Sequence, residues 1–146
     1  MSFGWINLIN IATVICLIVI NIIAVKKNIA GDFSSKYPII NIFEQIGRYG
    51  CMALMIIPFA VKNLEFGFNS IISMTIWICL TIVLLIIYAI LWSVKSKGIK
   101  AVIYGLAIIP ICIFVINGII LHHILLIIAA LIFGVCHIII VNENTN

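Results

Sequence analysis

The sequence predicts an all-α integral membrane protein, in which residues 1–146 form a single transmembrane domain built as a bundle of five helices. Hydrophobic residues make up 66% of the chain and charged residues only 8%, whereas soluble domains have about 25% charged residues. The mean hydropathy is +1.41. The apolar residues fall in separate runs, and a run of about 20 residues is long enough to cross a bilayer as a helix.

The first predicted helix covers residues 4–25 and is followed by a pair of lysines. Asn7, Asn10 and Asn21 share one face of this helix at about 100° per residue. An amide group in hydrocarbon needs a hydrogen-bond partner on another helix. The asparagine face is therefore expected to point into the bundle.

The second predicted helix, residues 38–61, is apolar over most of its length but contains Glu44, Gln45 and Arg48. Together with Asn41, these side chains fall within about 100° of one another on a helical wheel. The pattern predicts one polar face on an otherwise aliphatic helix. It is the feature of the sequence that points most directly to function.

Small residues and a proline mark two other places on this second helix. Gly47 and Cys51 are four residues apart and Gly50 lies between them, so a neighbouring helix is expected to approach closely along these positions. Pro58 predicts a local bend near the end of the helix, because proline cannot donate a backbone hydrogen bond.

The remaining helices are predicted at residues 71–94, 101–117 and 121–141. Pro110 predicts a kink in the fourth helix. Asn117-Gly118 predicts the end of that helix, with the glycine in the left-handed cap conformation. The polar C-terminal tail is expected to fray.

The distribution of lysine predicts the orientation of the protein, since positively charged loops favour the cytoplasm. Lys62 falls on one predicted side, and six lysines fall on the other. This pattern places the N-terminus outside and the C-terminus in the cytoplasm. Frequent Ile, Asn and Lys are typical of an AT-rich coding sequence, so we expect a multi-pass protein of a bacterial inner cell membrane. The six lysines are Lys26, Lys27, Lys36, Lys95, Lys97 and Lys100.

Composition also excludes several classes of site. The net charge of +4 comes from short loops, so no nucleic-acid partner is expected. The five cysteines occur one per apolar run without a CxxC motif, which favours small buried side chains over disulfides. His122 and His123 lie far from His137 along the last helix, and no acidic residue accompanies them. No metal site and no cofactor are predicted.

Glu44 and Arg48 carry the strongest functional signal, because they are charged and spaced i,i+4 in the favourable order. Arg48 would lie about 15 Å from the start of its helix, at about 1.5 Å per residue. A charge near the membrane centre costs about 2.5–3.5 kcal/mol on insertion scales. Three interpretations stay open: an amphipathic helix at the membrane surface, a structural ion pair that fixes helix register, and a ligand pocket.

The pocket interpretation predicts ligand-binding residues from four helices. His137 is the histidine predicted on the same side of the membrane as Glu44, so these two side chains could pair if their helices are neighbours. No catalytic residue is assigned. The predicted ligand-binding residues are Asn41, Glu44, Gln45 and Arg48 from the second helix, with Asn21, Tyr88 and His137 from its neighbours.

These residues lead us to expect a protein that binds or transports a small molecule or lipid inside the lipid bilayer. The alternative is a non-catalytic scaffold or subunit. In it, Glu44 and Arg48 form a structural pair, and the small-residue face of the second helix meets a second copy or another membrane protein. An enzyme is least expected, because no Walker loop, HExxH or GxSxG motif occurs. Glu44 with His137 or Tyr49 would be its acid–base pair.

Overall fold

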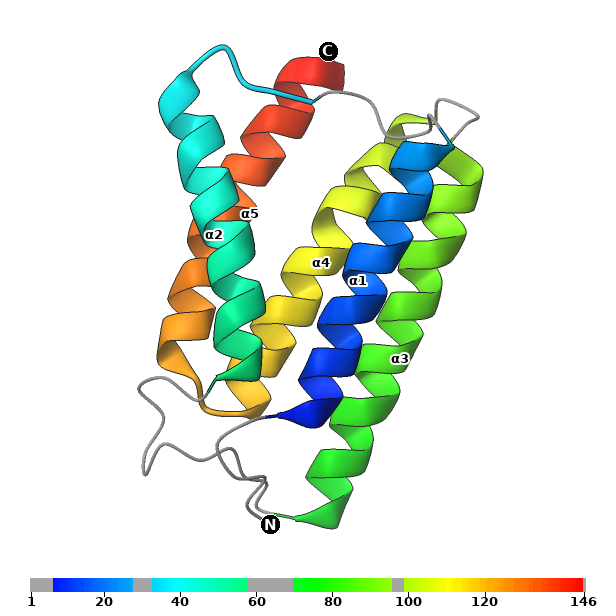
Figure 1. Ribbon diagram of the computed structural model, residues 1–146, viewed down its shortest axis with the longest axis vertical. Coiled ribbons are helices and arrows are strands. Elements are labelled where there is room, and N and C mark those ends of the chain that lie inside the picture. Colours follow the sequence, from blue (N-terminus) through cyan, green and yellow to red (C-terminus); the bar gives the residue numbers. More distant parts are fainter. Residues whose placement is uncertain (1–6, 28–32, 58–69, 96–98, 146) are drawn as a thin grey trace.

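The structure, a computed structural model, describes residues 7–27, 33–57, 70–95 and 99–145. These residues form five helices and contain no strand, which confirms the predicted all-α class (Figure 1). The helices are α1 (Leu8–Lys26), α2 (Pro38–Ile56), α3 (Ile71–Val94), α4 (Lys100–Ile120) and α5 (Ile124–Thr145).

Four of the five helices, α1, α3, α4 and α5, are long and apolar enough to cross a membrane. Helix α2 is as long as α1, with 19 residues, but its polar face lowers its hydropathy. It packs lengthwise against α5 at one side of the bundle (Figure 1). The chain is therefore a helical membrane bundle in which the most polar helix is held by its neighbours.

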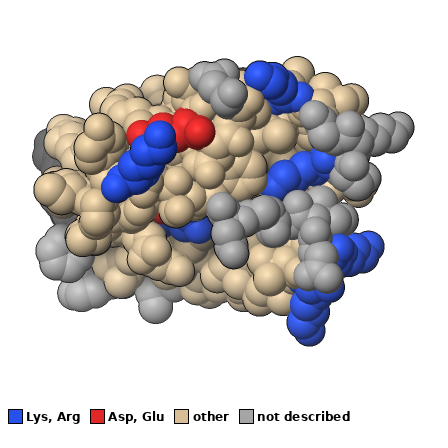
Figure 2. Space-filling model, turned by 90° about the horizontal axis from the view of Figure 1, so that it is seen from above, with Lys and Arg blue, Asp and Glu red and all other residues tan. Residues whose placement is uncertain are grey.

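The helices run alternately in opposite directions, so the bundle has two distinct ends (Figure 1). We call the end where α1, α3 and α5 finish the upper end, and the end where they begin the lower end. Helix α5 lies between α2 and α4, and α4 packs on α3. Figure 2 looks down on the upper end and shows Lys and Arg side chains spread across it. This is the end predicted to face the cytoplasm.

Helices α2 and α5 approach closely at Gly47. A Cβ atom there would lie 2.9 Å from the Phe133 Cβ and 3.0 Å from its Cα, distances that no side chain tolerates. Cys51, one turn further along, is fully buried. The predicted close approach at this pair is confirmed. At Gly50 the prediction is wrong, because a Cβ would meet nothing within 4 Å.

Helix α2 ends at Ile56, whereas the sequence predicted a helix to residue 61. Ile57 is extended, with φ −108° and ψ 127°. The ring of a following proline clashes with a helical residue in front of it, and Pro58 follows Ile57. The helix therefore stops before the proline instead of bending at it. Residues 58–61 lie outside the described residues.

The lower end of α2 is held by the beginning of α1. Asn10 donates its side-chain amide to the Met55 carbonyl at 2.9 Å, and the Asn7 backbone N–H donates to the Ile56 carbonyl at 3.2 Å. Asn7 also caps α1 by accepting the Asn10 backbone N–H at 3.0 Å. Both side chains are fully buried. The asparagine face of α1 thus points into the bundle, as predicted.

Helix α4 continues through Asn117 and Gly118 to Ile120, so the predicted helix end at Asn117-Gly118 is wrong. The left-handed residue is His122, with φ 55°. Gly118 serves a different purpose, since a Cβ there would lie 2.6 Å from Cγ1 of Ile127 in α5. Pro110 lies inside α4, with the helix continuous on both sides.

Helix α5 extends to Thr145, beyond the predicted end at residue 141, and its last turn closes the upper end. Asn142 accepts the Tyr104 hydroxyl at 2.8 Å. Glu143 accepts the Lys36 backbone N–H at 3.1 Å, and Asn144 donates to the Ser34 carbonyl at 2.9 Å. These contacts keep the tail helical where fraying was expected. They also tie residues 33–37, between α1 and α2, to the end of α5.

Candidate functional site

A cavity of about 640 Å³ lies between the helices toward the upper end. Every helix contributes to its wall, and Phe33 and Ser34 complete it from the segment before α2. The volume falls within the range of about 300–1,000 Å³ that is usual for small-molecule sites. The cavity is therefore large enough for a ligand.

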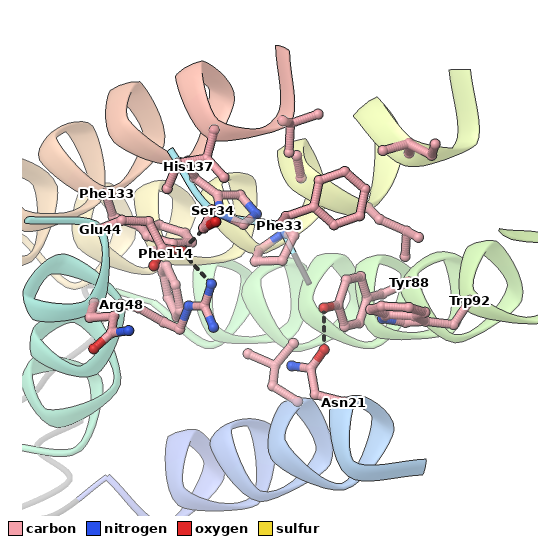
Figure 3. A pocket seen from close by; sticks show the side chains of 18 of the residues that line it. Asn21, Phe33, Ser34, Glu44, Arg48, Tyr88, Trp92, Phe114, Phe133 and His137 are labelled. Atoms are coloured by element: carbon pink, nitrogen blue, oxygen red, sulfur yellow. Dashed lines mark hydrogen bonds and ion pairs between the residues drawn. The ribbon is translucent and has the colours of Figure 1, made fainter. Parts of the chain in front are cut away.

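The structure brings all seven predicted ligand-binding residues to this cavity. They come from four helices: one from α1, four from α2, one from α3 and one from α5. In Figure 3, Arg48, Glu44 and His137 lie on one side of the cavity, Tyr88 and Trp92 on the opposite side, and Asn21 rises from α1. The seven lining residues are Asn21, Asn41, Glu44, Gln45, Arg48, Tyr88 and His137.

Glu44 is the centre of a three-residue polar cluster that joins α2 to α5. The carboxylate is buried, at 3% exposure. Its Oε1 accepts a hydrogen bond from Nη2 of Arg48 and lies 2.8 Å from Nδ1 of His137. The conditional prediction that Glu44 pairs with His137 is confirmed. One carboxylate oxygen therefore serves two partners, one on its own helix and one on α5.

Arg48 is only partly committed to this cluster. Its side chain is 40% exposed, and its guanidinium carbon lies 5.9 Å from the centre of the Phe133 ring. A guanidinium carries five N–H donors. Among the described residues Glu44 is its acceptor, so several donors remain available on the cavity side.

Phe133 supports both basic members of the cluster. The His137 ring stacks on it at 4.9 Å between centroids, with 25° between the planes. Phe114 meets its edge at 5.7 Å. Because Phe133 is also the residue that contacts Gly47, the close approach of α2 and α5 fixes the aromatic platform beneath Arg48.

The opposite wall carries a second polar pair. The Tyr88 hydroxyl donates to Oδ1 of Asn21 at 2.8 Å, which links α3 to α1. The edge of the Trp92 ring meets Tyr88 at 6.3 Å between centroids. Tyr88 was predicted to line the pocket, and the structure places it in the wall beside Trp92.

The remaining two predicted residues have unequal roles. Both polar groups of Asn41 are used locally, since it accepts the Ser35 backbone N–H at 2.8 Å and donates to the Ser35 carbonyl at 3.0 Å. Asn41 therefore positions the segment before α2. Gln45 is exposed at the rim of the cavity and keeps its side chain available.

Lys95 is the cavity residue that sequence reasoning missed. Its Nζ lies 4.9 Å from the Phe33 ring centre and 4.6 Å from the Trp92 ring centre. Burial lowers the pKa of this lysine from its ordinary value. The available signal was its position three residues beyond Trp92, but the sequence interpretation treated it as a loop charge that sets topology.

Two sequence interpretations lose their support in this arrangement. An amphipathic helix lying on the membrane surface does not fit α2, because α2 packs lengthwise on α5 and buries Glu44. Tyr49 is 64% exposed and lies outside the cavity wall, so it does not join Glu44 as an acid–base partner. Within the described residues, no group of three His, Cys, Asp or Glu is placed to hold a metal ion.

No protein-family model, no curated protein and no solved structure matches this chain. The candidate site therefore has to be interpreted from its own geometry. That geometry consists of a cavity, one partly free guanidinium, one buried carboxylate and two aromatic walls.

Proposed function

We propose that this protein binds a small molecule or lipid in the cavity beside Glu44 and Arg48, within a bacterial inner cell membrane and with its upper end toward the cytoplasm. The single observation that carries the proposal is the Arg48 guanidinium, which faces a cavity of about 640 Å³ with its side chain 40% exposed. A charged side chain inside a membrane bundle is a functional candidate by default, because placing a charge in the membrane is unfavourable.

The proposed division of roles follows from the contacts. Glu44 and His137 hold the guanidinium in place, so Arg48 does not have to be ordered when a ligand arrives. Its free N–H groups would donate to a carbonyl or anionic oxygen of the ligand. The aromatic walls would cover the apolar part, as in small-molecule sites generally.

Transport would require the cavity to open, and α4 is the helix best suited to move. Pro110 lines the cavity and cannot donate to the carbonyl of Leu106, one turn earlier, which also lines it. The upper half of α4 is thus joined to its lower half by one hydrogen bond fewer than a regular helix.

The rival proposal, a scaffold in which Glu44 and Arg48 form a structural pair, draws on the Glu44–His137 contact between α2 and α5. The scaffold proposal needs a small-residue surface that a partner can reach. Gly47 is covered by Phe133 of α5 and Cys51 is fully buried, so neither residue is open to a partner. A structural pair would also leave no reason for the cavity beside it.

The test is Arg48→Met, which removes the charge but keeps a long apolar side chain. Protein purified in mild detergent is extracted, its bound small molecules and lipids are identified by mass spectrometry, and its melting temperature is measured. We expect the variant to lose the co-purified ligand. Its melting temperature should stay close to that of the wild type, because the buried Glu44 carboxylate keeps His137 as a partner when Arg48 is removed.

Lys100→Met is the matched control, since Lys100 is exposed at the start of α4 and lies outside the cavity wall. It should keep the ligand. If the wild-type protein holds no ligand and Arg48→Met unfolds, the scaffold proposal replaces the binding proposal. The double variant Glu44→Gln/Arg48→Met checks folding, because removing both charges leaves neither one unpaired.

A further inference from the structure

The charges that line the cavity do not balance. Among the described residues of the wall, Arg48 and Lys95 are positive and Glu44 is negative, which leaves one excess positive charge when His137 is neutral. The Glu44 carboxylate is already shared between Arg48 and His137. Moving a charge from water into an apolar bundle is unfavourable unless an opposite charge lies beside it. The cavity is therefore electrostatically suited to an anion.

Lys95 is the side chain that supplies the excess positive charge. It is half-buried between the rings of Phe33 and Trp92, which attract its ammonium through their faces. The ion pairs found among the described residues do not include Lys95. Burial lowers the pKa of this lysine, because the ammonium loses contact with water. An anion at this position would restore the missing counter-charge.

Two side chains of the cavity wall have N–H donors that lack an acceptor among the described residues. Arg48 has N–H groups beyond the one that Glu44 accepts. The indole N–H of Trp92 is buried and has no hydrogen-bond partner among the described residues, and an indole can only donate. A ligand that satisfies these groups must supply acceptor oxygens, as a phosphate or a carboxylate does.

The apolar part of the cavity lies below these donors and includes Leu17 of α1, Met52 of α2 and Phe114 of α4. A purely polar anion would leave this part of the wall without a partner. A ligand with both an oxyanion and a hydrocarbon portion would match the two parts of the cavity at once.

Exposed residues line the cavity where α1 and α2 face each other. The hydrogen bonds between these helices lie at their lower ends, and the helices separate toward the upper end (Figure 1). Val25 of α1 and Gln45 of α2 both line the cavity and are both exposed. In a bilayer this side of the bundle faces lipid.

We propose that the ligand is an anionic lipid, whose headgroup oxyanion lies between Arg48 and Lys95 and accepts the Trp92 N–H, and whose chain leaves the cavity between α1 and α2. The inference rests on the proposed function and specifies its ligand class. The same oxyanion chemistry exists in soluble phosphate. The apolar wall and the exposed lining residues of α1 and α2 favour the membrane as the source.

The experiment measures quenching of tryptophan fluorescence by lipids brominated on their acyl chains, with the purified chain in detergent. Trp92 lies in the cavity wall and reports on a chain bound beside it. Brominated phosphatidylglycerol should bind at least about tenfold more tightly than brominated phosphatidylcholine, which corresponds to about 1.4 kcal/mol. Inorganic phosphate should not displace it.

Lys95→Met should reduce this preference to about threefold or less, as expected for the loss of one charge-assisted contact. Lys95→Arg should keep it, which shows that the charge and not the fold is responsible. Lys100→Met should behave as wild type. Displacement by inorganic phosphate would overturn the lipid source, and an unchanged preference in Lys95→Met would overturn the role of Lys95.

The outcomes separate this inference from the proposed function. If both lipids bind equally and Arg48→Met still loses its co-purified ligand, the cavity binds a ligand but the anionic headgroup is wrong. If neither lipid quenches and the wild-type protein carries no ligand, both proposals fail together.

Discussion

Glu44 has two partners, one within its own helix and one on another helix. Its carboxylate accepts from Arg48 on the same helix and meets His137 on α5. The first contact follows from helical spacing and could be predicted locally. The second joins residues 93 positions apart and was predictable only because the lysine pattern assigned both residues to one side of the membrane.

Lys95 shows where prediction at the residue scale ended. Its ammonium lies over Phe33, which belongs to the segment between α1 and α2. That segment is placed by its contacts with the last turn of α5, from Asn144 to the Ser34 carbonyl. The spacing of Lys95 from Trp92 is visible in the sequence. Its contact with Phe33 is not, because it depends on how the segment before α2 packs on the end of α5.

His123 leads to a prediction about pH. Its Nδ1 accepts the Leu126 backbone N–H at 3.2 Å and so caps α5, which leaves the proton on Nε2, 3.3 Å from the Ile57 carbonyl. Burial lowers the pKa of this histidine below its ordinary 6.5. The unfolded chain therefore binds the proton first as the pH falls. Stability should be constant above about pH 6.5 and decrease below it.

The measurement is the melting temperature in detergent between pH 8 and pH 5. The loss at low pH should approach about 1 kcal/mol, the usual contribution of a helix N-cap. His123→Gln should be less stable at pH 8 but show a flatter pH profile. Its neighbour His122 is exposed, and His122→Gln should keep the wild-type profile. An equally steep profile in both variants would contradict the prediction.

At the scale of helices, α2 is the element whose position decides the site. Its small-residue face packs on α5 while its polar face lines the cavity. Both faces were predictable from spacing, because a helix repeats every 3.6 residues. Its lower end was predicted less well, since Ile57 leaves the helix before Pro58 and is held there by His123.

The two glycines of α2 give a matched test of this packing. Gly47→Ala should destabilise the protein by about 1–3 kcal/mol, the usual cost of overpacking, because the new Cβ would meet Phe133 at 2.9 Å. Gly50→Ala, where nothing lies within 4 Å, should be stabilising by about 0.5–1 kcal/mol. Thermal unfolding in detergent measures both. Equal effects would show that α2 and α5 do not pack as described.

Helix ends depend on partners that a local pattern does not contain. Asn117-Gly118 resembles a helix stop, yet α4 continues through it. The Trp77 indole N–H donates to Oδ1 of Asn117 at 2.9 Å. The Asn117 side-chain amide donates to the Ile113 carbonyl, in the preceding turn of α4, at 2.8 Å. The asparagine is thus satisfied inside the helix, and the glycine is needed for the contact with Ile127.

The two ends of the bundle have different contents among the described residues. At the lower end, side chains of α1 and the turn before α5 satisfy the last carbonyls of α2. At the upper end the helices enclose the cavity and carry the lysines. The number of helices and their alternation followed from the apolar runs. The order of the helices around the cavity did not, because several arrangements satisfy the same apolar pattern.

The orientation of the molecule is a prediction that labelling can check. Two substitutions, Lys27→Cys and Ser70→Cys, introduce labelling sites at exposed positions. Lys27 lies just beyond α1 at the upper end, and Ser70 lies just before α3 at the lower end. In intact cells a membrane-impermeant maleimide should label Ser70→Cys and should label Lys27→Cys only after the cells are lysed. The wild-type chain, with its own five cysteines, gives the background. The reverse pattern would place the upper end outside.

The Glu44–His137 contact also has a consequence for biosynthesis. The two residues are 93 positions apart, and ribosomes add about 5–20 residues per second. For roughly 5–19 s after Glu44 is made, α2 has neither its histidine nor the α5 surface that buries it. The most polar helix of the chain must therefore wait, at the translocon or at the membrane surface, until the last helix is synthesised. The complete bundle becomes stable only after α5 has been synthesised.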